Sequence, residues 1–282
     1  MEVRRMNEKN SKNKKGMSMK GQRTLAYIVL IIISFFCLFW FYVLFINATR
    51  SNGALKKGFT AIPGGHLIEN WKNLLAGTLP VWNGMFNSIF IATCSAVLCT
   101  YFSTMTAYAI HAYNFKAKKF MFTFILAVMM IPTQVTALGF LQLLGKIGLD
   151  DSFVPLIVPS IAAPVTFFYM KQYMESTLSL EMIEAARIDG SKEWNTFNKI
   201  ILPIMKPAVA TQAIFQFIAQ WNNLFTPTIL LTTDSKKTLP MFVQLLSSNQ
   251  FRTDYGVVYV GLFVTIIPLV VVYLVLSKYI VA

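Results

Sequence analysis

Six stretches of this chain lack charged residues over about the length that a helix needs to cross a lipid bilayer. Crossing takes roughly 20 apolar residues, because every backbone polar group must be bonded within the segment. The first two lie at about 25–46 and 85–113, and the other four lie between the charged residues at 119 and 146, 151 and 171, 206 and 234, and 254 and 278. With 55% hydrophobic and 13% charged residues, the chain has little polar surface for a soluble domain of 282 residues. The sequence predicts an all-α integral membrane protein with six transmembrane helices.

Proline distinguishes the later stretches from the earlier ones. The fourth holds Pro155, Pro159 and Pro164, which interrupt helical hydrogen bonding unless neighbouring groups compensate. We expect Pro227 and Pro268 to kink the fifth and sixth helices. The first stretch follows a basic segment as a signal peptide would, but it is about twice as long as the apolar region of a signal peptide. We interpret it as a retained first helix.

Positive charge sets the expected orientation. With the N-terminus inside, 17 of the 25 Lys and Arg residues fall on the cytoplasmic side, which is the side that carries the excess in membrane proteins. Residues 1–24 are then a basic cytoplasmic tail, both termini are cytoplasmic, and the external loops are at about 48–84 and 232–255. The net charge of +13 is explained by this bias and by attraction to anionic lipid, so we expect no nucleic-acid partner.

Cysteine and histidine give no sign of a metal site or a disulfide framework. Cys37, Cys94 and Cys99 all fall inside predicted spans, where free cysteine behaves as a small apolar residue. His66 and His111 are isolated from one another and from cysteine. We therefore predict that the chain binds no metal.

A polar island separates the fourth and fifth spans. Residues 179–188 predict a short helix in which two adjacent alanines allow close approach by a neighbour. Gly190 follows the helix end and can take the left-handed conformation that satisfies terminal carbonyl groups. Ser191 is then placed to cap a second helix.

The second helix of the island has its own apolar pattern. Trp194, Phe197 and Ile201 recur at three- and four-residue intervals and predict one apolar face, and Pro203 with Pro207 is expected to end the helix. Such an amphipathic elbow can dock a soluble partner or lie flat on the membrane surface. Periodicity alone does not separate the two readings.

The residues of the island resemble a known motif. Glu184-Ala185-Ala186, three residues, Gly190, nine residues, Ile200, one residue and Leu202-Pro203 match the EAA loop of ATP-binding-cassette (ABC) importer permeases. Other segments are similar to the carbohydrate-uptake branch of that family, namely Asn87-Ser88, Ala107-Tyr108-Ala109, Ile131-Pro132 and Trp221-Asn222-Asn223. The chain most resembles the six-helix permease of maltose, glycerol-phosphate and multiple-sugar importers over roughly residues 25–280.

The resemblance implies a type I importer permease fold for residues 25–282, with a cytoplasmic coupling loop at 175–207. It implies a second homologous permease, two cytoplasmic ABC ATPase subunits and an external sugar-binding protein as partners, in a bacterial plasma membrane. Within the loop, Glu184 would make a charged contact with the ATPase and Gly190 would form the turn. The implied coupling set is Glu184, Ala185, Ala186, Asp189, Gly190, Ile200, Leu202 and Pro203.

Energy for transport is expected to come from another polypeptide. The sequence has no GxxxxGK[ST] phosphate-binding loop, so ATP and Mg²⁺ would be used by the partner ATPase, and no catalytic residue or cofactor is assigned to this chain. A standalone secondary carrier or channel for a small polar solute is the alternative. The near absence of acidic residues within the spans disfavours a carrier driven by protons or sodium. A membrane-embedded enzyme would need clustered acidic or histidine side chains that the spans lack.

Polar side chains within spans are costly and often face a cavity or a partner helix. The substrate-path candidates among them are Gln134, Gln142, Gln216, Gln220, Asn222 and Asn223, with Trp221 as an aromatic face on which a sugar ring can stack. Hydrogen bonding between helices is the alternative role. On the outside, the resemblance makes residues 232–255 a contact for the binding protein through Lys236, Lys237, Gln244, Asn249, Gln250 and Arg252.

Overall fold

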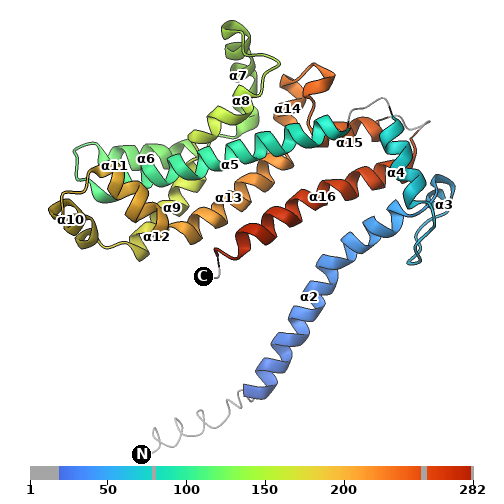
Figure 1. Ribbon diagram of the computed structural model, residues 1–282, viewed down its shortest axis with the longest axis horizontal. Helices are drawn as coiled ribbons and strands as arrows, with labels where there is room; N and C mark the ends of the chain where they lie inside the picture. The colour runs from blue at the N-terminus through green and yellow to red at the C-terminus, as the bar shows by residue number, and fades with distance from the viewer. Residues whose placement is uncertain (1–18, 78–80, 249–252, 281–282) are drawn as a thin grey trace, which may run out of the picture.

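The computed structural model describes residues 19–77, 81–248 and 253–280, and every regular element in these ranges is helical (Figure 1). This confirms the all-α prediction. In chain order the elements are α2 (Met19–Ala48), α3 (Asn52–Lys56), α4 (Leu67–Ala76), α5 (Val81–Ala112), α6 (Lys118–Val128), α7 (Thr133–Ile147), α8 (Val154–Ile157), η1 (Val158–Ile161), α9 (Pro164–Thr177), α10 (Leu180–Ile188), α11 (Glu193–Asn195), η2 (Thr196–Ile201), α12 (Leu202–Ile204), α13 (Lys206–Trp221), α14 (Phe225–Leu230), η3 (Asp234–Lys236), α15 (Leu239–Ser247) and α16 (Tyr255–Ser277).

Four helical segments in the described ranges are long and apolar enough to cross a membrane. They are α2, α5, the 154–177 segment and α16, with 30, 32, 24 and 23 residues. A fifth is added if Glu193–Ile204 and α13, which meet at 79°, are counted as one span. The structure thus gives four or five spans by length and composition, where the uncharged stretches predict six.

The expected third span is divided into α6 with 11 residues and α7 with 15. The break lies at residues 129–132, where Pro132 has an extended backbone and precedes α7. The N–H groups of Met129, Met130 and Ile131 bond to carbonyls three residues earlier, which is the tight geometry of a helix end. An uncharged stretch therefore predicts apolar length, but Ile131-Pro132 prevents one continuous helix.

The prolines of the fourth stretch were expected to interrupt a helix. In the structure they lie at the beginnings of three helical segments. Pro155, Pro159 and Pro164 lie within the first two positions of α8, η1 and α9, where a missing N–H costs little. In the fifth stretch the helix ends earlier than predicted, since α13 stops at Trp221 and Pro227 lies in the separate α14. Pro268 is inside α16.

Helix α5 is the centre of the bundle, and α13, α9, η1 and α15 pack on it. Its buried side chains are mostly small, from Gly84 and Ser88 to Cys99 and Ala107, which lets neighbouring helices approach closely. Side chains from α5 also fix a distant connection. Asn87 Nδ2 donates to the carbonyls of Ser235 and Lys237 at 2.9 and 3.0 Å, and Ser88 Oγ accepts from Leu239 N at 2.9 Å.

Helix α2 stands apart from this bundle (Figure 1). Its only buried residues are Ile46, Asn47 and Ala48 at its end, where Phe45 also contacts Phe263 of α16 with ring centroids 5.6 Å apart. The rest of the helix exposes an apolar surface on all sides. Such a surface is covered by lipid or by another protein.

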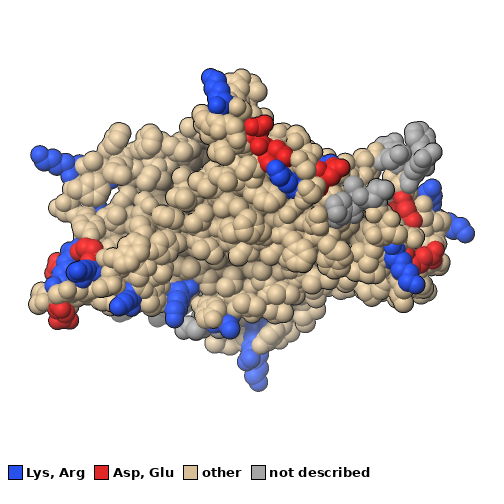
Figure 2. Space-filling view, turned by 45° about the horizontal axis from the view of Figure 1, so that its top comes forward, with Lys and Arg blue, Asp and Glu red and all other residues tan. Residues whose placement is uncertain are grey.

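The connections expected to be external loops are partly helical. Residues 48–84 hold α3 and α4, and residues 232–255 hold η3 and α15, whose Leu239, Met241 and Phe242 are buried. Asn249, Gln250 and Arg252 lie outside the described residues, as does most of the 1–24 tail. Figure 2 shows charged side chains at both ends and along the upper and lower edges of the molecule, with a broad uncharged area in the middle of this face. That distribution is typical of a protein that spans a bilayer.

Candidate functional site

The polar island forms a helical elbow at the end of the molecule opposite α3 and α4 (Figure 1). Its first limb, α10, ends in a Schellman motif: Gly190 N donates to Arg187 O and Ser191 N donates to Ala186 O, both at 3.0 Å. Gly190 has φ +77°, so its left-handed conformation confirms the prediction. A Cβ at Gly190 would meet no atom within 4 Å, which means that conformation and not space favours glycine here.

Helix α10 presents one face to the body and one to the outside. Ile183 and Ala186 are buried, whereas Glu184, Ala185 and Asp189 are exposed. Several large apolar side chains are exposed beside them, namely Leu180, Met182 and Ile188, the last at 86%. An exposed surface that mixes a carboxylate, alanine and large apolar groups is suited to protein contact.

The second limb differs from the prediction at two places. Its N-terminal flanking residue is Lys192 and not Ser191, whose Oγ instead accepts a hydrogen bond from Thr196 Oγ1 at 2.9 Å. Phe197 and Ile201 are buried as expected, but Trp194 is 63% exposed. A turn of π-helix over η2 shifts the register after Asn195, so the pattern of three- and four-residue steps does not place all three on one face.

The end of the second limb agrees with the prediction. The limb stops at Ile204, between Pro203 and Pro207, and the chain turns by 79° into α13, which begins at Lys206. Ile200 and Leu202 pack partly buried against the core cluster of Phe197, Ile201 and Met205. Pro203 itself is exposed.

A polar cluster joins the two limbs to the end of α5. Arg187 Nε donates to Glu193 Oε1 at 2.7 Å, and the Tyr108 hydroxyl donates to Glu193 Oε2 at 2.8 Å. The Arg187 guanidinium also lies 5.2 Å from the centre of the Tyr113 ring. The hydrogen bond from Arg187, aided by those of the phenols, lowers the pKa of Glu193 to about 2. Glu193 is therefore charged at neutral pH and connects α10, α11 and α5.

The motif pattern did not identify this connection. Tyr108 was part of the family resemblance, but nothing in the sequence relates it to Glu193, 85 residues later. The only sequence signal is weak: an acidic residue three positions after Gly190 and an Arg three positions before it. The elbow is thus tied to a spanning helix through side chains outside its predicted coupling set.

A groove of about 700 Å³, called the polar groove here for the amide side chains on its mostly apolar wall, lies between α7, the 154–163 segment, α13 and α14. Four of the substrate-path candidates line it, namely Gln134, Gln216, Gln220 and Asn223. Asn223 Nδ2 donates to Gln220 Oε1 at 3.4 Å, and Asn223 Oδ1 accepts from Thr226 N at 3.3 Å. Amide groups on an otherwise apolar wall can bind hydroxyl groups as both donors and acceptors.

Three other candidates do not line this groove. Trp221 is 1% exposed: its ring stacks on Phe217 with centroids 5.8 Å apart, and its Nε1 donates to Thr265 O at 3.0 Å. Its aromatic face is therefore part of the core, contrary to the expectation that it faces a sugar. Asn222 and Gln142 are exposed and lie elsewhere.

Sequence reasoning also missed a connection beside the groove. Asp151, a non-glycine residue with φ +52°, accepts from Thr232 N and Thr233 N at 2.9 and 3.1 Å and from Lys236 Nζ at 3.0 Å. The hydrogen bonds of Thr233 and Lys236 lower the pKa of Asp151. This connection joins the α7–α8 turn to the segment after α14. Each of these two segments is continuous with a wall of the groove.

Comparison with known proteins agrees with the architecture. The family described as "Binding-protein-dependent transport system inner membrane component" matches residues 100–281. The arabinooligosaccharides transport system permease protein AraQ of Halalkalibacterium halodurans is 31% identical over 272 residues, covering 94% of this chain and 97% of the relative. The sn-glycerol-3-phosphate transport system permease protein UgpE of Escherichia coli strain K12 is 29% identical, covering 86% and 88%.

Two further similarities extend the comparison. The lactose transport system permease protein LacG of Rhizobium radiobacter is 27% identical, covering 89% of this chain and 91% of the relative. A solved bacterial ABC transporter involved in the import of the acidic polysaccharide alginate has a similar fold, with a TM-score of 0.79, 23% identity, and coverage of 94% of this chain and 98% of the other. The chain therefore belongs to the family of binding-protein-dependent transport system inner membrane components, as a multi-pass membrane permease and not an enzyme.

Proposed function

We propose that this chain is the permease subunit of an ATP-driven importer of sugars, with oligosaccharides as its cargo. Relatives named for arabinooligosaccharide and lactose transport support the cargo class. The amides that line the groove support it chemically, because sugar hydroxyl groups need partners that both donate and accept. The substrate path we propose is lined by Gln134, Gln216, Gln220 and Asn223.

In the proposed topology the chain crosses the membrane six times, with both termini cytoplasmic. Helices α6 and α7 form one broken span, and α13 with α14 forms another. The excess of Lys and Arg on the elbow side supports this orientation. The elbow then faces the cytoplasm, and residues 48–84 and 232–255 face the binding protein.

We infer that the elbow couples this chain to an ATPase. The observation that carries this inference is the exposed face of α10, which holds Glu184 and Ala185 in the helix that ends at the left-handed turn of Gly190. Ile183 and Ala186 fix the opposite face to the body, so a force on α10 is passed inward. Glu193 passes it on to α5 through Tyr108. ATP and Mg²⁺ are bound by the ATPase, and a second homologous permease completes the path.

The proposal is tested by identifying what co-purifies with the tagged chain after gentle extraction from its native membrane. Wild-type protein is compared with Glu184→Arg and with a matched control, Glu69→Arg, which reverses an exposed helical carboxylate at the other end of the molecule. We expect wild type and the control to retain a second permease and an ATPase, and Glu184→Arg to lose the ATPase alone. Recovery of the chain alone, or an ATPase retained by all three proteins, would count against coupling through this face.

A further inference from the structure

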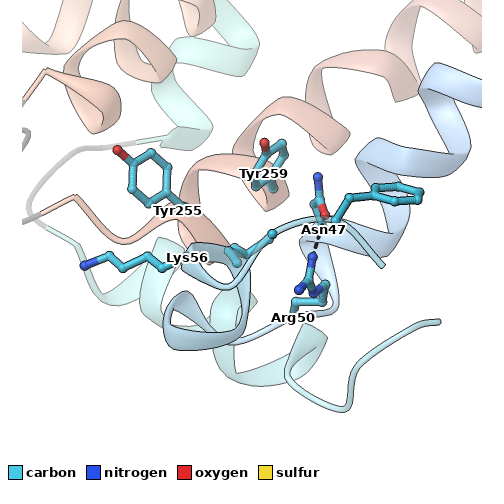
Figure 3. Close-up of a pocket in the computed structure, with 8 residues that line it drawn as sticks. Asn47, Arg50, Lys56, Tyr255 and Tyr259 are labelled. Atoms are coloured by element: carbon cyan, nitrogen blue, oxygen red, sulfur yellow. Dashed lines mark hydrogen bonds between the residues drawn. The ribbon is translucent and has the colours of Figure 1, made fainter. Parts of the chain in front are cut away.

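A second pocket, of about 360 Å³, lies at the opposite end from the elbow, where α2 ends beside the start of α16. Figure 3 shows Asn47 and Arg50 on one side of it, Lys56 and Tyr255 on the other, and Tyr259 between them. The Lys56 side chain extends away from Arg50 in this view. None of these residues belongs to the elbow or to the polar groove.

Arg50 is the unusual member of this pocket, because its charge is buried. The residue is 7% exposed, and its guanidinium donates to two neutral oxygens: Nη1 to Asn47 Oδ1 at 3.4 Å and Nη2 to Ala54 O at 2.6 Å. Within residues 19–77, 81–248 and 253–280, no carboxylate forms an ion pair with it. A buried cation without a counter-ion is costly.

The surroundings of Arg50 offset only part of that cost. The carbonyl end of α2 carries a partial negative charge, which is a fraction of one elementary charge. Lys56, the other charged residue that lines this pocket, is also positive, and Lys57 follows it in the chain. The local charge is therefore balanced best by an anion that comes from outside the chain.

The location of the pocket indicates which anion. It begins where the apolar length of α2 ends, and two tyrosines from the first turns of α16 line it, as is common at the level of lipid headgroups. Phe59, which also lines the pocket, is 65% exposed and contacts the ring of Phe39 on α2. An anionic group joined to apolar chains matches a charged pocket that continues into an apolar helix surface.

We propose that Arg50 binds the phosphodiester group of an anionic phospholipid in the leaflet opposite the elbow. Arg is well suited to phosphate because its planar guanidinium offers several donors at once. Lys56 at the rim favours a lipid with net negative charge over a zwitterionic one. The bound lipid would hold the end of α2 against α16, at the one place where α2 is buried in this chain.

The test uses the assembled importer in nanodiscs that contain equal amounts of phosphatidylglycerol and phosphatidylcholine, followed by native mass spectrometry of the retained lipids. Arg50→Gln removes the charge, Arg50→Lys keeps it, and Lys57→Gln is the matched control, since Lys57 is exposed and does not line the pocket. A second arm adds inorganic phosphate to delipidated importer and records its thermal stability beside short-chain phosphatidylglycerol.

Wild type and Lys57→Gln should retain phosphatidylglycerol selectively, and Arg50→Gln should retain about tenfold less, as expected for loss of a hydrogen bond to a charged group. Arg50→Lys should keep most of the retention, which also separates loss of binding from misfolding. If Arg50→Gln fails to assemble, Lys56→Gln is measured instead and should lose the preference for phosphatidylglycerol. Equal retention by all variants, or stabilisation by inorganic phosphate equal to that by the lipid, would overturn the lipid assignment.

Discussion

Replacement of Gly190 tests whether the left-handed turn of the elbow is needed for transport. A side chain at this position meets no atom within 4 Å, so any loss comes from backbone strain and not from steric overlap. The left-handed region costs an ordinary residue about 1–2 kcal/mol, and a β-branched residue lies at or above the upper end. Asn adopts this region readily and is the matched control.

The size of the effect on coupling depends on whether the backbone strain is present in the free elbow or only in the docked elbow. The turn is held by two hydrogen bonds, from Gly190 N and Ser191 N, together contributing about 2 kcal/mol. In Gly190→Val the strain cancels this contribution, so the free elbow no longer holds the left-handed turn. Docking on the ATPase must then form the turn again. A docking penalty of about 2 kcal/mol corresponds to roughly 30-fold weaker coupling. Gly190→Asn should stay within about twofold of wild type.

The assay reconstitutes each variant with its partner subunits in proteoliposomes and measures uptake of an arabinooligosaccharide together with ATP hydrolysis. Membrane content and assembly with the second permease should be unchanged in both variants, because α10 remains anchored by Ile183 and Ala186. Uptake by Gly190→Val equal to wild type would refute the requirement for the turn. Equal losses in Val and Asn variants would show that side-chain size and not handedness matters.

Three further predictions concern other parts of the molecule. Tyr108→Phe removes the donor to Glu193 and should lower the stability of the elbow by about 1 kcal/mol, since that carboxylate keeps Arg187 and is partly solvated; hydrogen exchange of α10 and α11 measures this. Gly84→Ala would overlap the buried ring of Phe242 and should destabilise the α5–α15 contact by about 1–3 kcal/mol, measured as a lower Tm of the purified complex. Gln220→Leu removes an amide from the groove and should raise the KM for cargo uptake about tenfold, measured in proteoliposomes.

Controls for these three predictions come from the same structure. Gly139→Ala is the control for the α5 variant, because a Cβ there meets no atom within 4 Å and the Tm should not fall. Gln142→Leu is the control for the groove, because Gln142 is exposed and does not line it. An unchanged KM in Gln220→Leu, or an equal rise in both variants, would remove Gln220 from the path. Unchanged exchange in Tyr108→Phe would remove Tyr108 from the elbow connection.

Local signals in the sequence predicted the features that depend on local physics. Gly190 takes the left-handed conformation because a helix that ends at an exposed turn leaves carbonyls that only such a turn satisfies. The helical class followed from apolar length alone. Phe197 and Ile201 are buried because the spacing of apolar residues in a short helix selects an inner face.

Features that depend on distant contacts were not predictable in the same way. Trp194, Phe197 and Ile201 follow one another at three- and four-residue intervals, which predicts a shared helix face. A π-helical turn puts Trp194 on a different face from the other two. Trp221 was expected in the path, but its ring stacks on Phe217 and its N–H finds Thr265, 44 residues away. The length of the third uncharged stretch predicted one continuous helix, but hydropathy carries no information on the backbone. Pro132 separates this stretch into two helical segments.

The central claim, that α10 docks an ATPase, is tested most directly by site-directed cross-linking. Glu184→Cys is introduced after replacement of Cys37, Cys94 and Cys99 by Ser, and the assembled importer is treated with a short thiol-to-amine cross-linker in its native membrane. We predict one adduct that contains the ATPase, with a yield that changes when ATP is added. Reaction of position 184 with a membrane-impermeant reagent added outside the cell would contradict the account. So would the absence of an adduct when an ATPase is present in the complex.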